Sequence, residues 1–328
     1  MKRRSVIASL PCAAVASWLL PTQARAQTSA FPSRAVRIVV PFGPGGPTDL
    51  TARLAGEKLA QRWGQPVLIE NRAGAGGAVG SEQVARAPAD GYTIVLGVTG
   101  SHGINISLNP NLGYHPVKDF EPLTQATLFP NVIAVHPGVG AQNLTELLRL
   151  ARERPGSLSY GSDGNGTASH LGMELVKART KTFIVHIPYR GSAAMLADLA
   201  GGQIQVGITG LPAALPLAKA GKIRLLAVTT AERAAAAGDV ATVAEQGLSG
   251  FVAAPWSGFF APKGTPKAVV DKLSEDLIWA LTQPDLRQRM ADAGSAIVAS
   301  RPDAFARFVL AEVDRWALAV KTSGATLD

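Results

Sequence analysis

The sequence predicts an α/β fold made of two lobes. Apolar, strand-like runs alternate with amphipathic helical runs along nearly the whole chain, a pattern typical of largely parallel sheets. About 300 residues is too many for one small core and suits two. Two extended stretches without helical periodicity, at 119–137 and 251–266, interrupt the alternation. They indicate a chain that leaves the first lobe, builds the second and returns, so we expect a hinged molecule with a ligand cleft between its lobes.

The individual elements follow from the spacing of apolar residues and from capping signals. Asn143 and Pro302 are typical of helix starts, whereas Gly64, Gly201 and Gly221 are typical of helix stops. Strands are expected at 36–40, 67–70, 93–97, 132–136, 183–187, 204–208 and 223–229. Helices are expected at 49–63, 79–86, 144–152, 168–179, 193–199, 212–220, 267–282, 284–293 and 302–322.

The N-terminus has the pattern of an export leader. A basic segment at 2–4 precedes a moderately apolar stretch at 6–20, and Ala24 and Ala26 form the small–x–small pattern of a cleavage site. We expect residues 1–26 to be a signal peptide that is cut after Ala26, which predicts a periplasmic protein. The apolar stretch is too short to span a membrane. The general secretory and twin-arginine export routes both stay open.

Removing the leader changes the charge balance and the cysteine count. Four of the 32 Lys and Arg residues lie in it and no acidic residue does, so 28 basic residues remain against 24 acidic ones, a net charge of +4. This charge predicts no nucleic-acid partner and mildly favours anionic ligands. Because Cys12 is the single cysteine, zinc–thiolate sites and cysteine nucleophiles are excluded. The five histidines lack metal-ligand spacing, and we expect neither a metal nor a cofactor.

The most informative motif is VPFGPGGPTD at 40–49, a corner between an expected strand and an expected helix. Its glycines allow close approach of the backbone to a ligand, and a helix that begins there presents free N–H groups and a positive dipole end. This arrangement can hold an anion such as a carboxylate without a charged side chain. Thr48 or Asp49 can cap the helix, so a purely structural turn is the alternative. The motif lacks the lysine of a phosphate-binding loop.

A second glycine-rich corner, ENRAGAGGAVG at 70–80, also follows a strand and opens a helix. A dinucleotide fingerprint would require glycine where Val79 stands, so that match fails. Gly76 could contact a ligand, or the small residues could simply serve close packing of a helix on a sheet. The sequence leaves both interpretations open.

A third corner, YGSDGNGTASH at 160–170, belongs to the second lobe. Ser162 and His170 raise the possibility of a serine hydrolase, but a nucleophile elbow would require glycine at Tyr160. We therefore favour hydrogen bonding and capping by Ser162 and Thr167 over catalysis. Further on, Tyr189 offers a ring and a hydroxyl and Arg190 a fork for a carboxylate, with a packed tyrosine and a surface arginine as the alternatives.

Taken together, these motifs identify a resemblance. From about residue 31 to the C-terminus the chain resembles the Bug-type extracytoplasmic solute-binding receptors of tripartite tricarboxylate transporters. The matching segments are VPFGPGGPTD (40–49), ENRAGAGG (70–77), ADGYT (89–93), KDF (118–120), YGS (160–162), GT (166–167), HL (170–171), PYRG (188–191), LAVT (226–229) and WSG (256–258). The chain departs from the family pattern at His115, at 235–239 and at Ala241, all away from the expected cleft.

The resemblance implies a two-lobed periplasmic-binding-protein fold, similar to type II, that closes on its ligand. Lobe one would comprise 27–128 and 254–328, and lobe two 129–253. Such receptors bind small carboxylates, largely through main-chain groups, hydroxyls and bridging waters. The ligand-binding residues carried over are Phe42, Gly43, Gly45, Gly46, Thr48, Asp49, Gly76, Ser162, Gly166, Thr167, His170 and Tyr189.

The function expected is therefore capture of a small organic anion by lobe closure, without turnover and without a metal or cofactor. The partners would be the membrane permease subunits of a tripartite tricarboxylate transporter, and the receptor would be a monomer. Two alternatives stay open: a periplasmic sensor that presents the same ligand to a signalling protein, and a periplasmic hydrolase that uses Ser162 and His170. Ester turnover abolished by Ser162→Ala would identify the hydrolase.

Overall fold

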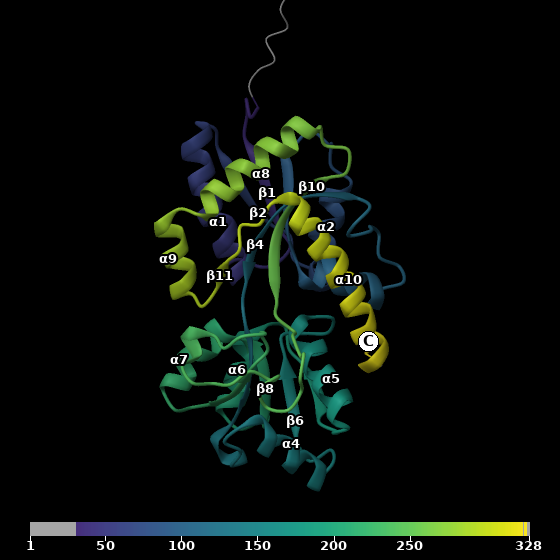
Figure 1. Ribbon diagram of the computed structural model, residues 1–328, viewed down its shortest axis with the longest axis vertical. Coiled ribbons are helices and arrows are strands. Elements are labelled where there is room, and N and C mark those ends of the chain that lie inside the picture. Colours follow the sequence, from purple (N-terminus) through teal and green to yellow (C-terminus); the bar gives the residue numbers. More distant parts are fainter. Residues whose placement is uncertain (1–30, 324, 327–328) are drawn as a thin grey trace, which may run out of the picture. The chain divides into compact units, whose positions relative to one another are not determined.

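The computed structural model describes residues 31–323 and 325–326 (Figure 1). The expected signal peptide and its cleavage site lie outside the described residues. From Phe31 onward the chain forms one compact unit, which contains two β-sheets with helices packed against them. This confirms the α/β class predicted from the alternating pattern.

The first sheet is built from β1 (Val36–Val40), β2 (Val67–Asn71), β3 (Thr93–Val98), β4 (Phe120–Leu128), β10 (Trp256–Pro262) and β11 (Ala296–Ile297). Its strand order is β11-β4-β10-β3-β1-β2. β1 lies parallel to β2 and β3, whereas β10 runs antiparallel between β3 and β4. Ile38 and Val40 enter the core on one face and Val39 the core on the other. Burial of both faces explains why β1 is apolar except at the exposed Arg37.

Helices cover both faces of this sheet (Figure 1). They are α1 (Pro47–Trp63), α2 (Ala78–Ala85), α8 (Lys267–Leu281), α9 (Pro284–Asp292) and α10 (Pro302–Ser323). α1, α8 and α9 share one core with the sheet, and α2 and the first half of α10 share the other. A π-helical turn (Gly100–Ile104) and α3 (Asn105–Leu108) follow β3. Neither was expected from the sequence, because Gly100 and Gly103 break the apolar spacing that predicts a helix.

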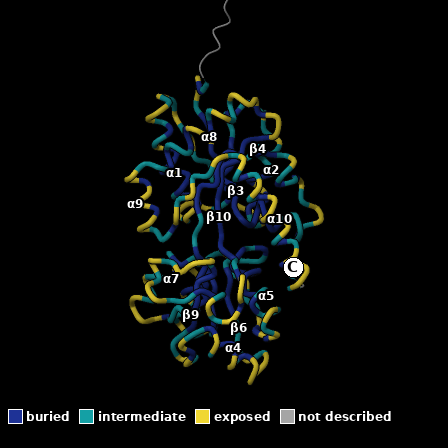
Figure 2. Tube along the Cα trace, in the orientation of Figure 1, coloured by how far each residue is buried: buried dark blue, intermediate teal, exposed yellow. Residues whose placement is uncertain are grey.

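The second sheet consists of β5 (Asn131–Val135), β6 (Ser159–Ser162), β7 (Val185–Pro188), β8 (Val206–Gly210) and β9 (Arg224–Val228). Its helices are α4 (Leu144–Glu153), α5 (Ala168–Thr180), α6 (Ser192–Ala200) and α7 (Leu211–Lys219). α4 and α5 pack on one face and α6 and α7 on the other. The central strands of both sheets are buried (Figure 2). β6 was not expected, because its four residues form no apolar run.

Both sheets follow one strand order. The strand order of the second sheet is β7-β6-β8-β5-β9, and the matching part of the first sheet is β2-β1-β3-β10-β4. In this comparison β6 corresponds to β1, because each is followed by the first long helix that begins at a glycine-rich corner of its lobe. β10 in the first sheet and β5 in the second run antiparallel to both of their neighbours, and each adjoins a crossing between the sheets. The two extended stretches of the sequence contain these crossings, since the chain passes from β4 directly to β5 and later returns through 251–255 into β10.

Helix α10 contacts the cores of both sheets. Phe305 and Val309 in its first half pack in the core of the first sheet, whereas Trp316 near its end packs in a core of the second. Between them Glu312, 3% exposed, accepts hydrogen bonds from the indole N–H groups of Trp256 at 2.7 Å and Trp316 at 2.9 Å. The last helix therefore joins the return crossing to the second sheet.

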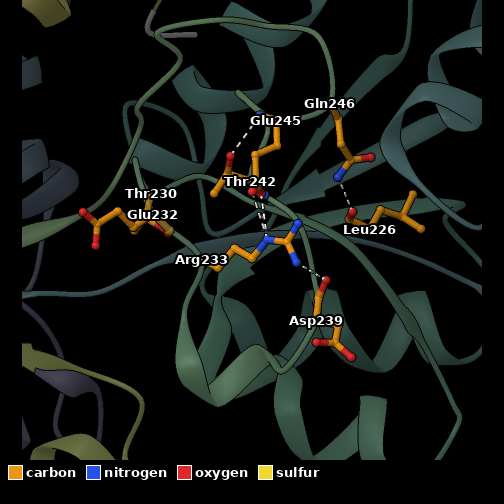
Figure 3. Close-up of polar contacts among 8 residues, drawn as sticks. All are labelled: Leu226, Thr230, Glu232, Arg233, Asp239, Thr242, Glu245 and Gln246. Carbon is orange, nitrogen blue, oxygen red and sulfur yellow. Dashed lines mark hydrogen bonds and ion pairs between the residues drawn. The ribbon is translucent and has the colours of Figure 1, made fainter.

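The loop after β9, where the sequence departs from the family pattern, is held by side chains (Figure 3). Arg233 donates from Nε to both carboxylate oxygens of Glu245 at 3.0 Å. Thr242 and Glu245 form a reciprocal capping pair, since each accepts a hydrogen bond from the main-chain N–H of the other at 2.7–3.0 Å. Gln246 donates to the carbonyl oxygen of Leu226 at 2.8 Å. These bonds fix the loop.

Candidate ligand-binding cavity

A cavity of about 290 Å³ lies between the two sheets. Its wall on the first sheet comes from the corner after β1, from Gly76 and from the end of β3 at 98–100. Its wall on the second sheet comes from the starts of α5, α6 and α7. Phe129, Asn131 and Trp256 line it from the two crossings. The volume lies near the lower end of the range for small-molecule sites, which suits a small metabolite.

The corner after β1 is fixed by the carboxylate of Asp49, which is 4% exposed. Oδ2 accepts hydrogen bonds from the main-chain N–H of Gly45 and from Nε of Arg53, both at 2.9 Å, and Oδ1 accepts one from Asn71 at 2.9 Å. Asn71 also donates to the carbonyl of Phe42 at 3.0 Å. Burial opposes ionisation, but these bonds outweigh it and lower the pKa of Asp49. Asp49 therefore holds the loop in place and is neutralised by Arg53.

Four helices of nine or more residues begin at the cavity: α1 and, from the second sheet, α5, α6 and α7. Three of them, with Gly46, Gly191 and Gly210 at the N-cap, have no side-chain cap. Helix starts carry N–H groups without intrahelical partners and a partial positive charge. The lining residues that the structure describes include no Lys, Arg or His. In the described lining, partial positive charge is therefore offered by main-chain dipoles and not by basic side chains.

Asn131, the first residue of β5, contributes an unused hydrogen-bond donor. The residue lines the cavity and is 2% exposed, and its Nδ2 has no hydrogen-bond partner within the described part of the chain. A buried donor without a partner costs about 1–3 kcal/mol. An acceptor on a bound ligand would satisfy it.

Asp163 is a second carboxyl group in the cavity wall. Its Oδ1 accepts a hydrogen bond from the hydroxyl of Thr209 at 2.7 Å, and its main-chain N–H donates to Ser169 at 3.1 Å. Burial raises the pKa of this carboxyl to about 6, although bonds from Thr209 and Ser169 act in the opposite direction. The side chain therefore changes charge in the physiological range of pH.

The residues expected to bind ligand divide into two groups. Those that line the cavity are Phe42, Gly43, Gly46, Thr48, Asp49, Gly76 and Thr167. Gly45, Ser162, Gly166, His170 and Tyr189 lie outside the lining and make contacts within the protein instead.

These supporting residues shape the corners from behind. Gly45, with φ +88°, and Gly166, with φ +72°, adopt turns that favour glycine. The N–H of Gly166 donates to Nδ1 of His170 at 3.3 Å, and the ring of His170 stacks on His186 with centroids 4.2 Å apart. The hydroxyl of Tyr189 donates to Asp198 at 2.7 Å, and burial together with that carboxylate raises the pKa of Tyr189 to about 12.

Ser162 pairs with His186 rather than with His170. Its hydroxyl lies 2.8 Å from Nε2 of His186, and the residue is fully buried. Burial, followed by the nearby charges of His170 and Lys177, lowers the pKa of His186 to about 3, so the ring is neutral. A catalytic base is most effective with a pKa near the working pH, and a nucleophile must be reachable. This pair suits a structural role.

Several residues of the lining were not expected from the sequence. Phe129, Asn131 and Trp256 lie in crossings that carry no ligand-binding motif, and Thr209 and Ala213 flank the corner between β8 and α7. The sequence did contain a signal for that corner: a strand is followed by Gly210 and by a proline near the start of a helix. The corner after β1 has the same arrangement.

Two helix-covered sheets of one strand order, two crossings and a cavity between them define a two-lobed periplasmic-binding fold. The family model described as "Tripartite tricarboxylate transporter family receptor" (TctC) matches residues 51–325. The chain belongs to this family, which consists of periplasmic solute-binding receptors and not of enzymes. No helix within 31–323 or 325–326 is long and apolar enough to cross a membrane.

Solved structures give the same result. The periplasmic binding protein BugD is 35% identical, with a TM-score of 0.80, over 90% of this chain and 99% of its own. Rpa4515 from R. palustris, solved with adipate, is 38% identical, with a TM-score of 0.83, over 90% of this chain and all of its own. MatC from Rhodopseudomonas palustris, solved with bound malate, is 34% identical, with a TM-score of 0.79, over 88% and 100%. The Bug-type resemblance seen in the motifs is thereby confirmed.

Proposed function

We propose that this receptor captures a small carboxylate in the cavity between its lobes and delivers it to the permease of a tripartite tricarboxylate transporter. The observation that carries the proposal is the convergence of four helix N-termini, from both sheets, on one cavity. Partial positive charge without a lysine or arginine favours a carboxylate that is held by N–H groups and can be released again. Adipate in Rpa4515 and malate in MatC are carboxylates of this size.

The residues of the wall have distinct roles in this proposal. Gly43, Gly46 and Thr48 present main-chain N–H groups and a hydroxyl from the corner after β1, while Asp49 holds that corner in shape. Gly76 and Phe42 close the side of the cavity. Thr167 and the start of α5 meet the ligand from the second lobe. The amide of Asn131 donates to a ligand oxygen, which removes the cost of its unused N–H group.

Binding by closure follows from where the crossings lie. Lobe one, 27–128 and 254–328, and lobe two, 129–253, would rotate about the crossings next to Asn131 and Trp256, and both residues line the cavity. A ligand that contacts both lobes stabilises the closed state in proportion to its differential affinity for it. The permease would recognise that closed form of the monomeric, periplasmic receptor, from which the leader 1–26 has been removed.

Gly46→Val tests the proposal. A Cβ at this position meets no atom within 4 Å and the backbone has φ −83°, so the fold tolerates it, while the side chain crowds the start of α1. A thermal-shift screen of wild type against mono-, di- and tricarboxylates, amino acids and aromatic acids identifies a ligand, because a bound ligand raises the melting temperature. We expect Gly46→Val to lose that rise.

The control is Gly64→Ala at the other end of the same helix. Gly64 has φ +63° at the C-cap, so alanine there costs about 1 kcal/mol of stability but lies far from the cavity wall. It should lower the melting temperature and leave ligand affinity unchanged. Equal affinity in wild type and Gly46→Val would contradict the proposed site.

A further inference from the structure

The two acidic residues in the cavity wall differ in what neutralises them. Asp49 forms an ion pair with Arg53 at 2.9 Å and accepts bonds on both of its oxygens. Asp163 forms no ion pair with any residue in the described part of the chain, and the groups that hydrogen-bond to its carboxyl, Thr209 and Ser169, are neutral hydroxyls. The charge of Asp49 is therefore compensated by the protein, whereas the charge of Asp163 is not.

A carboxylate in this position changes what the cavity can hold. Asp163 lines the cavity from the second lobe, whereas the corner after β1 lines it from the first, and burial raises the pKa of Asp163 to about 6. Ionised and buried carboxylates require a cation or several donors, since the charged form loses its hydration. A second carboxylate of a ligand at this end would meet a like charge, whereas an ammonium group there would neutralise the site.

We propose that Asp163 selects the ligand class, and that the ligand is a small amino acid. Its carboxylate lies at the helix N-termini, and its ammonium group pairs with the carboxylate of Asp163. The proposal rests on the proposed function, because it assumes that the cavity binds a carboxylate. It deepens that function, since helix dipoles alone would accept a dicarboxylate as readily as an amino acid.

A structural role for Asp163 makes a different prediction. If the side chain only accepted the hydroxyl of Thr209, Asp163→Asn would keep that bond through its amide oxygen, and ligand preference would stay the same. Specificity expressed as a ratio of affinities separates the two roles, because a general change in stability affects all ligands alike.

The experiment compares ligands of equal carbon count. Purified protein, freed of bound ligand by unfolding and refolding, is titrated by calorimetry with succinate, α-aminobutyrate and γ-aminobutyrate, and with adipate, norleucine and ε-aminocaproate. The variants are Asp163→Asn and, as a matched control, Asp198→Asn, an acid of α6 in the same lobe that pairs with Tyr189 and lies outside the lining.

We expect wild type and Asp198→Asn to prefer an amino acid over the dicarboxylate of its length by about tenfold or more. In Asp163→Asn the ratio should fall by at least that factor. A wild-type preference for succinate or adipate, or an unchanged ratio in Asp163→Asn, would overturn this inference and leave carboxylate binding intact. Failure of all six compounds to bind wild type would count against both proposals.

Discussion

Neutralising Asp163 should make the ligand-free protein more stable at neutral pH. Burial raises the pKa of the Asp163 carboxyl in the folded state from 3.8 to about 6. Between these two pH values the folded protein still holds a proton on Asp163, whereas the unfolded chain has released it. The contribution of the Asp163 carboxyl to the free energy of unfolding is therefore fully present below about pH 4 and is lost as the pH rises through about 6. A shift of roughly two units corresponds to at most about 3 kcal/mol of unfolding free energy above pH 7.

Denaturant unfolding of wild type and Asp163→Asn, measured without ligand between about pH 4 and pH 8, checks this result. The variant cannot ionise, so the difference in unfolding free energy should grow with pH in its favour and level off above about pH 7. Carboxyls with lowered pKa values, such as Asp49 and Glu70, occur in both proteins and cancel in the difference. A difference that does not change with pH would refute the reasoning.

Three further predictions concern the cavity, the core and the chemistry. Asn131→Leu should weaken ligand binding by about tenfold and leave the stability of the ligand-free protein unchanged or improved, because it removes a buried donor that has no partner. Calorimetry measures the affinity and unfolding curves measure the stability. Equal losses of binding free energy and of unfolding free energy would contradict this prediction. Gly258→Ala should cost about 3 kcal/mol in denaturant unfolding, since its Cβ would lie 2.1 Å from Cζ of Phe305; a loss below about 0.5 kcal/mol would be inconsistent with that packing. Ser162→Ala should not change hydrolysis of p-nitrophenyl esters, which we expect to be at background in wild type; turnover that disappears in the variant would instead support a hydrolase.

The sequence predicted the fold class because its signals are local. β1 is apolar except at Arg37, and the long amphipathic patterns of α8 and α10 fix their faces. The glycine-rich corners also coincided with helix starts at the cavity, for α1 and for α5. Short elements such as β6 and the π-helical turn after β3 were not predicted, because they carry too little side-chain pattern to give a local signal.

The candidate site was less predictable, because a motif does not show which of its residues face the ligand. Ser162 and Asp163 are neighbours, yet Ser162 points to His186 and Asp163 lines the cavity. Strand geometry makes successive residues face opposite sides, so a shift of one position reverses the assignment. Asn131 and Trp256 reach the cavity only because two crossings, far apart in sequence, run side by side in the fold, and no local pattern records that.

The position of α10 has a practical consequence for protein engineering. Because this helix packs in a core of each sheet, with Glu312 bonded to two indoles between them, a recombinant fragment that stops before residue 302 would expose apolar surface on both halves. Apolar surface exposed in this way favours aggregation. A fluorescent reporter of ligand capture is better attached through the exposed loop that contains Gly238 than by shortening the C-terminal end.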